Sequence, residues 1–309
     1  MSSPAFRSSG DLAADRRYSY AMALLADGDA AAAGDLLDTT LELVPDWVPG
    51  WLALGEAREA AGDRDRAVAA FARALELEPQ DTLGASLRLA RLGAMAPPAA
   101  APAAFVRDLF DDYAPRFDKS LVDGLHYCGP ELIAAALQSA VPGRRFARAV
   151  DLGCGTGLMA AEIRASVGHL TGVDLSSGMI AAARGKGAYD RLVVGDIGTM
   201  LAGEAEASLD LVTAADVFCY LGDLAPIIAA SRRVLAPGGL FAFTIEDQID
   251  AAVTSGFSLR GSLRYCHRQD YVIGLGRRSG LDVLAISRGI LRTDRGLPVE
   301  GFAILFGRA

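Results

Sequence analysis

Lysine is almost missing from this chain, which has only Lys119 and Lys186 among its 309 residues. The formal net charge is −8, and no stripe of basic residues stands out along the sequence. A protein that binds nucleic acid without sequence preference needs positive charge opposite the phosphates. We therefore expect no nucleic-acid partner.

Long apolar runs are also missing. No run reaches the length that a membrane-spanning helix needs, and Met1–Arg17 is polar, without the apolar core of a signal peptide. The four cysteines show neither metal-ligand nor paired spacing, and are Cys128, Cys154, Cys219 and Cys266. These absences predict a cytoplasmic protein with free thiols, no bound metal and no contact with a membrane.

An internal repeat occupies the first third of the chain. Three pairs of equivalent residues are 34 residues apart, namely Gly28 and Gly62, Ala33 and Ala67, and Pro45 and Pro79. That period is the length of a tetratricopeptide (TPR) repeat, a pair of helices. The second copy has the clearer pattern, with Trp51, Leu54, Gly55, Gly62, Ala67, Phe71, Ala74 and Pro79. Thr82–Gly93 follows with the apolar spacing of a capping helix. Residues 1–93 therefore predict an all-α, TPR-like domain.

Residues 94–104 are rich in alanine and proline and predict a linker. From Phe105 the pattern alternates strand and helix, which favours an α/β domain over residues 105–309 with a mostly parallel sheet. Seven strands are expected, at Ala147–Leu152, His169–Leu175, Arg191–Gly195, Leu209–Ala215, Gly239–Glu246, Val283–Arg292 and Val299–Gly307. Helices fit between them at Leu158–Val167, Ser177–Arg184, Leu224–Leu235 and Gln269–Gly280.

The last two expected strands are separated only by Thr293–Pro298. A gap that short permits a hairpin but no parallel crossover. The last strand of the sheet should therefore be antiparallel.

Three glycines at alternate positions follow the first expected strand, within Val150–Leu158. Gly153, Gly155 and Gly157 tolerate positive φ and let backbone approach a ligand, at the place where open α/β sheets bind their ligands. Two other interpretations stay open. Gly155-x-Gly157-x-x-Ala160 satisfies a dinucleotide fingerprint, and the glycines also suit tight helix–strand packing.

Two acids beyond the glycines narrow the choice. Asp174 ends the second expected strand and suits the two hydroxyls of a ribose, although it also suits a helix cap before Ser176. Asp196 follows the third strand, where a carboxylate accepts a hydrogen bond from the amine of adenine and Ile197 lies against the ring. Dehydrogenases do not require an acid there.

At this point the sequence resembles the class I S-adenosylmethionine-dependent methyltransferases. The resemblance covers Phe105–Arg308 and rests on DLGCGTG, GVDLSSGMI, GDI and the turn at Arg233–Gly239. With the repeats in front, and with Leu109–Asp118, the chain resembles the bacterial predicted methyltransferases that contain TPR repeats. The expected fold is a seven-stranded Rossmann-like methyltransferase sheet behind the helical domain.

The resemblance implies S-adenosyl-L-methionine as cofactor and S-adenosyl-L-homocysteine as product. It places Asp151 and the Gly153 backbone at the methionine end of the cofactor, with Gly155 and Gly157 as further cofactor-binding residues of the loop. The ribose and adenine contacts are Asp174, Leu175, Met179, Asp196 and Ile197, and Asp216 and Val217 lie near the sulfonium. It also places Tyr113 and Phe117 in an aromatic lid. Their spacing equally suits an ordinary apolar helix face.

Methyl transfer needs mostly alignment of the acceptor, and a hydroxyl acceptor also benefits from a general base. The catalytic candidates are His267, Tyr265 and His126, with Tyr220 as a further pocket wall; His169 is expected to be structural. His267 also suits a cap for the helix that begins near Gln269. Arg264, Arg292 and Arg295 suit a carboxylate, a phosphate or a peptide terminus, or a plain surface position.

The segment Ala214–Phe218 lacks the Asn/Asp-Pro-Pro-aromatic signature of enzymes that methylate planar amino groups. The expected activity is therefore O- or N-methylation of a small-molecule acceptor, with the repeats as lid, homodimerisation module or partner module. The alternatives are a TPR-guided enzyme acting on a peptide or protein partner, and a scaffold with only residual cofactor binding.

Overall fold

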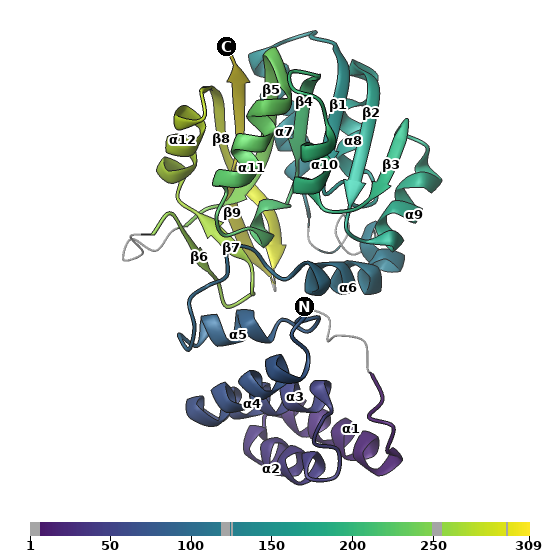
Figure 1. The fold of residues 1–309 in the computed structure, drawn as a ribbon, viewed down its shortest axis with the longest axis vertical. Helices are drawn as coiled ribbons and strands as arrows, with labels where there is room; N and C mark the ends of the chain where they lie inside the picture. The colour runs from purple at the N-terminus through teal and green to yellow at the C-terminus, as the bar shows by residue number, and fades with distance from the viewer. Residues whose placement is uncertain (1–6, 119–123, 125, 249–254, 295) are drawn as a thin grey trace. The chain divides into compact units, whose positions relative to one another are not determined.

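The computed structural model describes residues 7–118, 124, 126–248, 255–294 and 296–309. The chain divides into two compact units (Figure 1). The first contains residues 1–105 and 261–263, and the second contains residues 106–260 and 264–309.

Successive antiparallel helices build the first unit, as the 34-residue repeat predicts. They are α1 (Leu12–Ala26), α2 (Ala30–Leu41), α3 (Val48–Ala60), α4 (Arg64–Leu77) and α5 (Ala85–Arg91). The repeat glycines have distinct roles. Gly62 follows α3 with φ +81°, while a Cβ at Gly55 would lie 2.4 Å from the ring of Phe71. The absence of a side chain at Gly55 therefore lets α3 and α4 approach closely.

A seven-stranded sheet forms the centre of the second unit, with strand order β3-β2-β1-β4-β5-β9-β8. Its strands are β1 (Phe146–Leu152), β2 (Val167–Asp174), β3 (Arg191–Val194), β4 (Leu209–Ala214), β5 (Leu235–Glu246), β8 (Leu281–Asp294) and β9 (Leu297–Arg308). All neighbours pair in parallel except β9, which is antiparallel to both β5 and β8. The predicted α/β class and the antiparallel last strand are confirmed.

Helices cover both faces of the sheet (Figure 1). The helices of the second unit are α6 (Ala103–Tyr113, which begins in the first unit), α7 (Gly129–Ala140), α8 (Leu158–Ile163), α9 (Ser177–Lys186), α10 (Ile197–Gly203), α11 (Ala225–Val234) and α12 (Gln269–Arg278). Alternate strand residues point to opposite faces. Val150 and Val212 share a core with α10, α11 and α12, whereas Ala149 and Leu211 share one with α7 and α8.

Three features of the second unit are missing from the sequence-based assignment. They are the helix α7, the seven-residue helix α10, and a two-stranded sheet formed by β6 (Phe257–Leu259) and β7 (Tyr265–His267). The strands of that small sheet have three residues each, too short to show a period.

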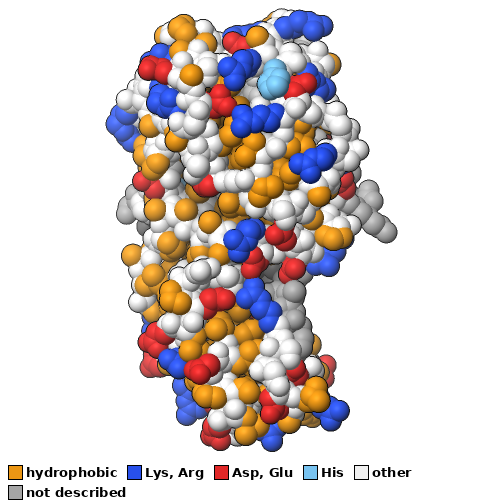
Figure 2. Space-filling model, turned by 45° about the vertical axis from the view of Figure 1, so that its right-hand side comes forward, with side chains coloured by type: hydrophobic (Ala, Val, Ile, Leu, Met, Phe, Trp, Pro, Cys, Tyr) orange, Lys and Arg blue, Asp and Glu red, His pale blue; other side chains and the backbone are white. Residues whose placement is uncertain are grey.

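None of the described helices is long and apolar enough to cross a membrane. On the face shown in Figure 2, side chains of both charge signs are interspersed, and neither sign forms a continuous patch.

Candidate active site

Glycine backbone shapes the loop that follows β1. Gly153, Gly155 and Gly157 all have positive φ, at +62°, +52° and +93°. A Cβ at Gly153 would lie 2.5 Å from Cγ2 of Val217, so that position has no room for a side chain. Gly157 is likewise close to the ring of Tyr189. The glycines therefore serve close packing as well as the turn.

A cavity that is open to solvent lies beside this loop. It is lined by Phe117, Tyr127, Pro130, Asp151, Gly153, Cys154, Gly155, Thr156, Leu158, Met159 and Ala215. The structure thus brings together four residues that the sequence assigns to the cofactor, Phe117, Asp151, Gly153 and Gly155.

Asp151 is fully buried at the end of β1. Its two carboxylate oxygens accept hydrogen bonds from the Tyr189 hydroxyl at 2.6 Å and the Thr213 hydroxyl at 2.7 Å. Burial raises the pKa of Asp151 to about 6, against the lowering effect of both hydroxyls.

Asp174 at the end of β2 binds the glycine loop directly. The Gly155 N–H donates to its Oδ2 at 2.9 Å, and the Ser176 N–H donates to its Oδ1 at 2.9 Å. The alternative that Asp174 caps the next helix is wrong, because Ser176 is the N-cap of α9 and accepts from the Met179 N–H. Met179 itself is fully buried, and Leu175 is half-buried.

Asp196 is exposed after β3, and its Oδ1 accepts from the Thr199 N–H at 2.8 Å. It therefore caps α10. Ile197 beside it is buried. Capping uses one carboxylate oxygen of Asp196. Asp196 is also the residue that the sequence assigns to adenine recognition.

Two aromatic residues, Tyr113 and Phe117, lie at the end of α6 and just beyond it. The rings of Tyr113 and Phe117 meet edge to face with centroids 5.4 Å apart, and both residues are half-buried. A Cβ built on Gly155 would lie 3.8 Å from the Phe117 ring, so that ring lies over the glycine loop. Phe117 therefore occupies the position expected of a lid. Residues 119–123 and 125 of the same expected lid lie outside the described residues.

Two acids, Asp111 and Asp118, bind the chain around these rings to the glycine loop and to α9. Asp118 accepts a hydrogen bond from the Thr156 hydroxyl and pairs with Lys186 Nζ at 2.6 Å. Asp111 accepts from the Gly178 N–H at 2.9 Å, at the start of α9. Together these contacts hold the segment against the glycine loop.

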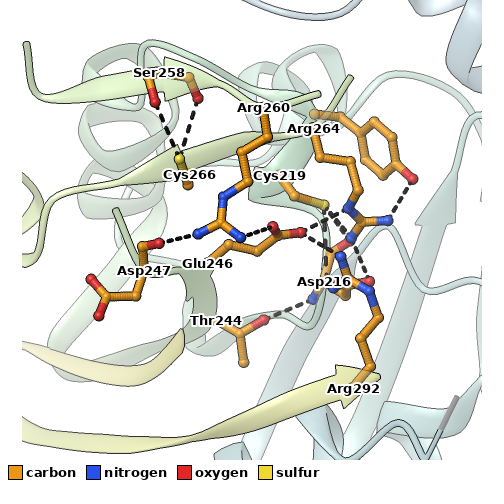
Figure 3. Close-up of polar contacts among 11 residues, drawn as sticks. Asp216, Cys219, Thr244, Glu246, Asp247, Ser258, Arg260, Arg264, Cys266 and Arg292 are labelled. Atoms are coloured by element: carbon orange, nitrogen blue, oxygen red, sulfur yellow. Dashed lines mark hydrogen bonds and ion pairs between the residues drawn. The ribbon is translucent and has the colours of Figure 1, made fainter. Parts of the chain in front are cut away.

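A buried cluster of opposite charges lies at the ends of β4 and β5 (Figure 3). Arg292 donates to Asp216 Oδ1 at 2.8 Å and to Glu246 Oε1 at 2.6 Å. Arg264 donates to Asp216 Oδ2 at 2.7 Å and to Glu246 Oε1 at 2.8 Å. Asp216 was expected near the sulfonium. The structure shows its two oxygens engaged by the two guanidinium groups.

Two details add to this charge cluster. Asp216 has φ +58°, unusual for a residue other than glycine, and its N–H donates to the Thr244 hydroxyl at 2.8 Å. A third guanidinium, that of Arg260, lies with Nη1 3.6 Å from Glu246 Oε2. Asp216, Cys219 and Glu246 also bring three potential metal ligands within 4.8 Å of one another. A metal ion at that point must displace the arginines.

The surface alternative for Arg264 and Arg292 is therefore wrong: both side chains are largely buried, Arg292 with 5% of its side-chain area exposed. Arg295 lies outside the described residues. Burial by itself raises the pKa of Glu246, but Arg264 and Arg292 outweigh it and hold the pKa at about 2. Glu246 is thus ionised across the physiological range.

The two aromatic pocket-wall candidates lie near this cluster. The Arg264 side chain donates to the Tyr220 hydroxyl at 2.9 Å and lies over the Tyr220 ring. Tyr265 is fully buried in β7. Neither tyrosine is among the residues that line the cavity at the glycine loop.

The candidate base His267 is fully buried in β7. Its Nε2 is 2.9 Å from the Leu221 carbonyl and 3.1 Å from the Gly222 carbonyl, so Nε2 carries the proton. Burial lowers its pKa to about 4. The alternative that His267 caps α12 is wrong, since the N-cap is Arg268, which makes no side-chain cap bond.

The other two histidines are exposed. His126 lies in a loop with φ +49°. His169 is in β2, with its ring 3.9 Å from the Asp190 carboxylate.

Comparison with known proteins matches both parts of the chain. A methyltransferase domain model matches residues 150–243, and a tetratricopeptide repeat model matches residues 48–92. The chain carries a methyltransferase domain. The dinucleotide interpretation of the glycine loop is set aside by this match.

The relatives of the methyltransferase domain are partial matches. The chain is 38% identical over 111 residues to the malonyl-[acyl-carrier protein] O-methyltransferase of Enterobacter lignolyticus, covering 36% of this chain and 43% of that protein. It is 34% identical over 137 residues to methyltransferase-like protein 27 of Homo sapiens, covering 44% and 55%. The chain thus spans about half the length of the curated relatives it matches.

Among solved structures, 1,6-didemethyltoxoflavin-N1-methyltransferase of Burkholderia thailandensis superposes with a TM-score of 0.51 at 18% identity. The match covers 70% of this chain and 93% of that chain, and it shows the shared fold.

Sequence reasoning missed three residues of the methyltransferase domain. Tyr189 and Thr213 hold the Asp151 carboxylate, and Tyr127 lines the cavity. Thr213 lies directly opposite Asp151 in the register of β4 against β1, a pairing that the alternation of strands and helices does not specify. Tyr127 follows the candidate His126 directly, so an aromatic at that point was the available signal.

Proposed function

We propose that the chain binds S-adenosyl-L-methionine at the glycine loop and transfers its methyl group to a small-molecule acceptor. The observation that carries the proposal is the cavity at the end of β1, lined by Asp151 and by Gly153–Thr156. The methyltransferase match and the named activities of the curated relatives support it.

The residues present fit this cofactor. The Asp151 carboxylate and the Gly153 backbone suit the methionine end, and Asp174 at the end of β2 suits the ribose. Gly155 has open space out to Phe117, which a larger residue at that position would fill. Asp196 and Ile197 follow β3 and suit the adenine.

When bound, the cofactor supplies a methyl group that its sulfonium makes electrophilic. The chain's contribution is to hold the acceptor in line and to keep water out. Phe117 lies over the loop and Tyr127 closes another wall of the cavity. The contacts of Asp118 with Thr156 and Lys186 hold that cover in place.

Calorimetry with S-adenosyl-L-methionine and S-adenosyl-L-homocysteine tests this proposal. We expect the wild type to bind both and Asp174→Ala to lose binding, because that carboxylate also fixes the Gly155 N–H. Asp65→Ala is the matched control, since its side chain is exposed in α4 of the other unit. A folded wild-type sample without measurable heat of binding contradicts the proposal.

We further propose that residues 1–93 form the repeat domain, residues 94–104 the linker and residues 105–309 the methyltransferase domain, and that the repeats bind a protein or peptide partner or a second copy of the chain. The repeat match supports this second role. Ion pairs join its helices, as Arg88 of α5 binds Glu56 of α3 at 2.6 Å and Arg58 of α3 binds Asp35 of α2 at 2.9 Å.

Methyl labelling separates this second role from a purely structural one. The full chain is incubated with labelled cofactor and a cell extract, which is then divided into protein and small-molecule fractions. Label in the protein fraction supports a partner that is also the acceptor. Label confined to small molecules contradicts a partner that is also the acceptor, and a monomeric chain in sedimentation contradicts the homodimer.

A further inference from the structure

The charge cluster adjoins the proposed cofactor cavity. Ala215, which lines that cavity, is followed directly by Asp216, and Val217 lies against Gly153 of the glycine loop. Because β4 and β5 are adjacent and parallel, Asp216 and Glu246 emerge at the same edge of the sheet as the loop after β1. Tyr127 links the two regions: it lines the cavity, and Asp216 and Arg292 act electrostatically on its hydroxyl.

The cluster has an excess of positive charge. Arg264 and Arg292 each bind both carboxylates, so these four groups balance. Arg260 adds a third cation, which is 3.6 Å from Glu246 and 28% exposed. An unbalanced charge in a poorly solvated site favours an anionic ligand.

Asp247 does not cancel this excess. Figure 3 shows that it contacts Arg260 through its backbone carbonyl, while its carboxylate points away. That carboxylate is 3.3 Å from Arg288, a neighbour with 59% of its side-chain area exposed. Among the described residues, Arg260 therefore pairs with no carboxylate other than Glu246, and part of its side chain is exposed.

Among the described residues of the cavity and cluster, no group suits the role of general base. Asp151 lines the cavity, but both its oxygens accept hydrogen bonds, from the Tyr189 and Thr213 hydroxyls. Both oxygens of Asp216 are bound by arginines, and Glu246 has a pKa of about 2. His267 carries its proton on Nε2, and its free Nδ1 is buried away from the cavity, whose lining does not include His267. Burial raises the pKa of Tyr127 well above its usual value. An acceptor that reacts here must need no deprotonation, and a carboxylate is already ionised at neutral pH.

We propose that the methyl acceptor is a carboxylate, attracted by the positive excess of Arg260, Arg264 and Arg292, and that the product is a methyl ester. This inference rests on the proposed methyltransferase function. A lone pair of the carboxylate oxygen forms the new bond to the methyl carbon as the carbon–sulfur bond breaks. The electron pair of that bond stays on sulfur and neutralises the sulfonium, and no proton moves.

The stability of the transferred label to base tests the chemistry. The full chain is incubated with methyl-labelled cofactor and an acid-soluble metabolite extract, and the product is treated with mild alkali. Methyl esters release the label as volatile methanol, whereas N-methyl groups and ethers keep it. Base-labile label is the expected result. Base-stable label overturns the carboxylate acceptor and leaves methyl transfer standing. Binding of S-adenosyl-L-homocysteine without any labelled product also overturns the carboxylate acceptor. Absence of that binding overturns the proposed function itself.

Arg260→Gln tests the specificity-determining residue. It removes the unbalanced positive charge and leaves the other two arginines of the cluster paired with the two carboxylates. We expect the labelling rate at limiting extract to fall by roughly tenfold or more, the range for a lost hydrogen bond to a charged group. The rate should recover at higher extract concentration, as for a raised KM, and Arg260→Lys should restore part of it.

Arg288→Gln is the matched control, since this exposed arginine shares the neighbour Asp247. It should label at the wild-type rate. Calorimetry should give the same affinity for S-adenosyl-L-homocysteine in wild type, Arg260→Gln and Arg288→Gln. A rate loss in Arg260→Gln that persists at all extract concentrations, no loss at all, or an equal loss in Arg288→Gln overturns the assignment.

Discussion

Two regions lie side by side at one edge of the sheet and are built in opposite ways. The glycine loop presents backbone: its residues are contiguous, and Gly153 has no space for a side chain. The charge cluster presents side chains from separate segments, with Asp216 after β4, Glu246 on β5, Arg264 before β7 and Arg292 on β8. The loop should therefore be sensitive to added volume, and the cluster to lost charge.

The largest expected effect tests the charge side of this comparison. Arg292→Met leaves Asp216 and Glu246 in the interior with one cation fewer, which should lower the free energy of unfolding by about 3–5 kcal/mol. Denaturant titration measures it. Arg288→Met should change stability by no more than about 0.5 kcal/mol, because that side chain is mostly solvated. Equal effects of the two substitutions would show that the cluster is not a coupled unit.

Added volume at the loop should act on cofactor binding. Gly153→Ala places a methyl group 2.5 Å from Val217 at a φ of +62°, and such strain of about 1–3 kcal/mol should weaken binding of S-adenosyl-L-homocysteine by roughly tenfold to a hundredfold. Calorimetry measures the affinity. Val217→Ala in the same chain should recover part of it by removing the contact. Gly185→Ala, with open space in α9, should bind normally.

Two buried groups, Asp151 before the glycine loop and His267 near Glu246 of the cluster, should respond to pH in opposite directions. His267 has a pKa lowered to about 4, so its contribution to stability is present above about pH 6.5 and is lost as pH falls toward 4. Asp151 has a pKa raised to about 6, so its contribution is present below about pH 4 and is lost as pH rises through 6. Each shift corresponds to about 3 kcal/mol, as an upper figure.

Denaturant titrations of the cofactor-free chain between pH 4 and pH 6.5 separate these contributions. The wild type should change little over this range. His267→Gln should become more stable toward pH 4, and Asp151→Asn should become less stable. Parallel profiles for the two variants would contradict the opposed assignment.

The smallest expected effect concerns the cover over the loop. Asp118→Asn weakens the pair with Lys186, whose partners are both more than a third exposed, so the change should amount to about 0.2–1 kcal/mol. Binding of S-adenosyl-L-homocysteine should weaken by no more than roughly fivefold, and added salt should reduce the difference from wild type. A loss as large as that of Gly153→Ala would make Asp118 part of the binding site itself.

Local signals predicted the sheet well. Each of the strands β1 to β5 ends within two residues of an acid, and the short gap between the last two strands was sufficient to predict the antiparallel last strand. α10 was missed although its N-cap is visible in the sequence, because Asp196 was assigned to adenine and its capping bond to Thr199 was not considered.

The charge cluster could not be predicted in the same way. Arg264 lies 18 residues beyond Glu246, and Arg292 lies 76 residues beyond Asp216. Their burial depends on the pairing of β9 with β5 and β8 and on the small β6–β7 sheet, which are contacts between distant segments. Taken alone, an arginine favours the surface, so the sequence indicated the opposite of what the fold imposes.

The single reversed strand has a consequence for where the sheet can accept inserted residues. Because β9 runs against its neighbours, β8 points the same way as β5 and ends, at Asp294, on the same edge of the sheet as β5 and the glycine loop. The turn to β9 follows directly. Hairpin turns tolerate insertions that sheet interiors do not. Residues inserted in this turn would lie beside the proposed acceptor site and would leave the strands unchanged. An insertion there is therefore a direct way to alter which acceptor is bound.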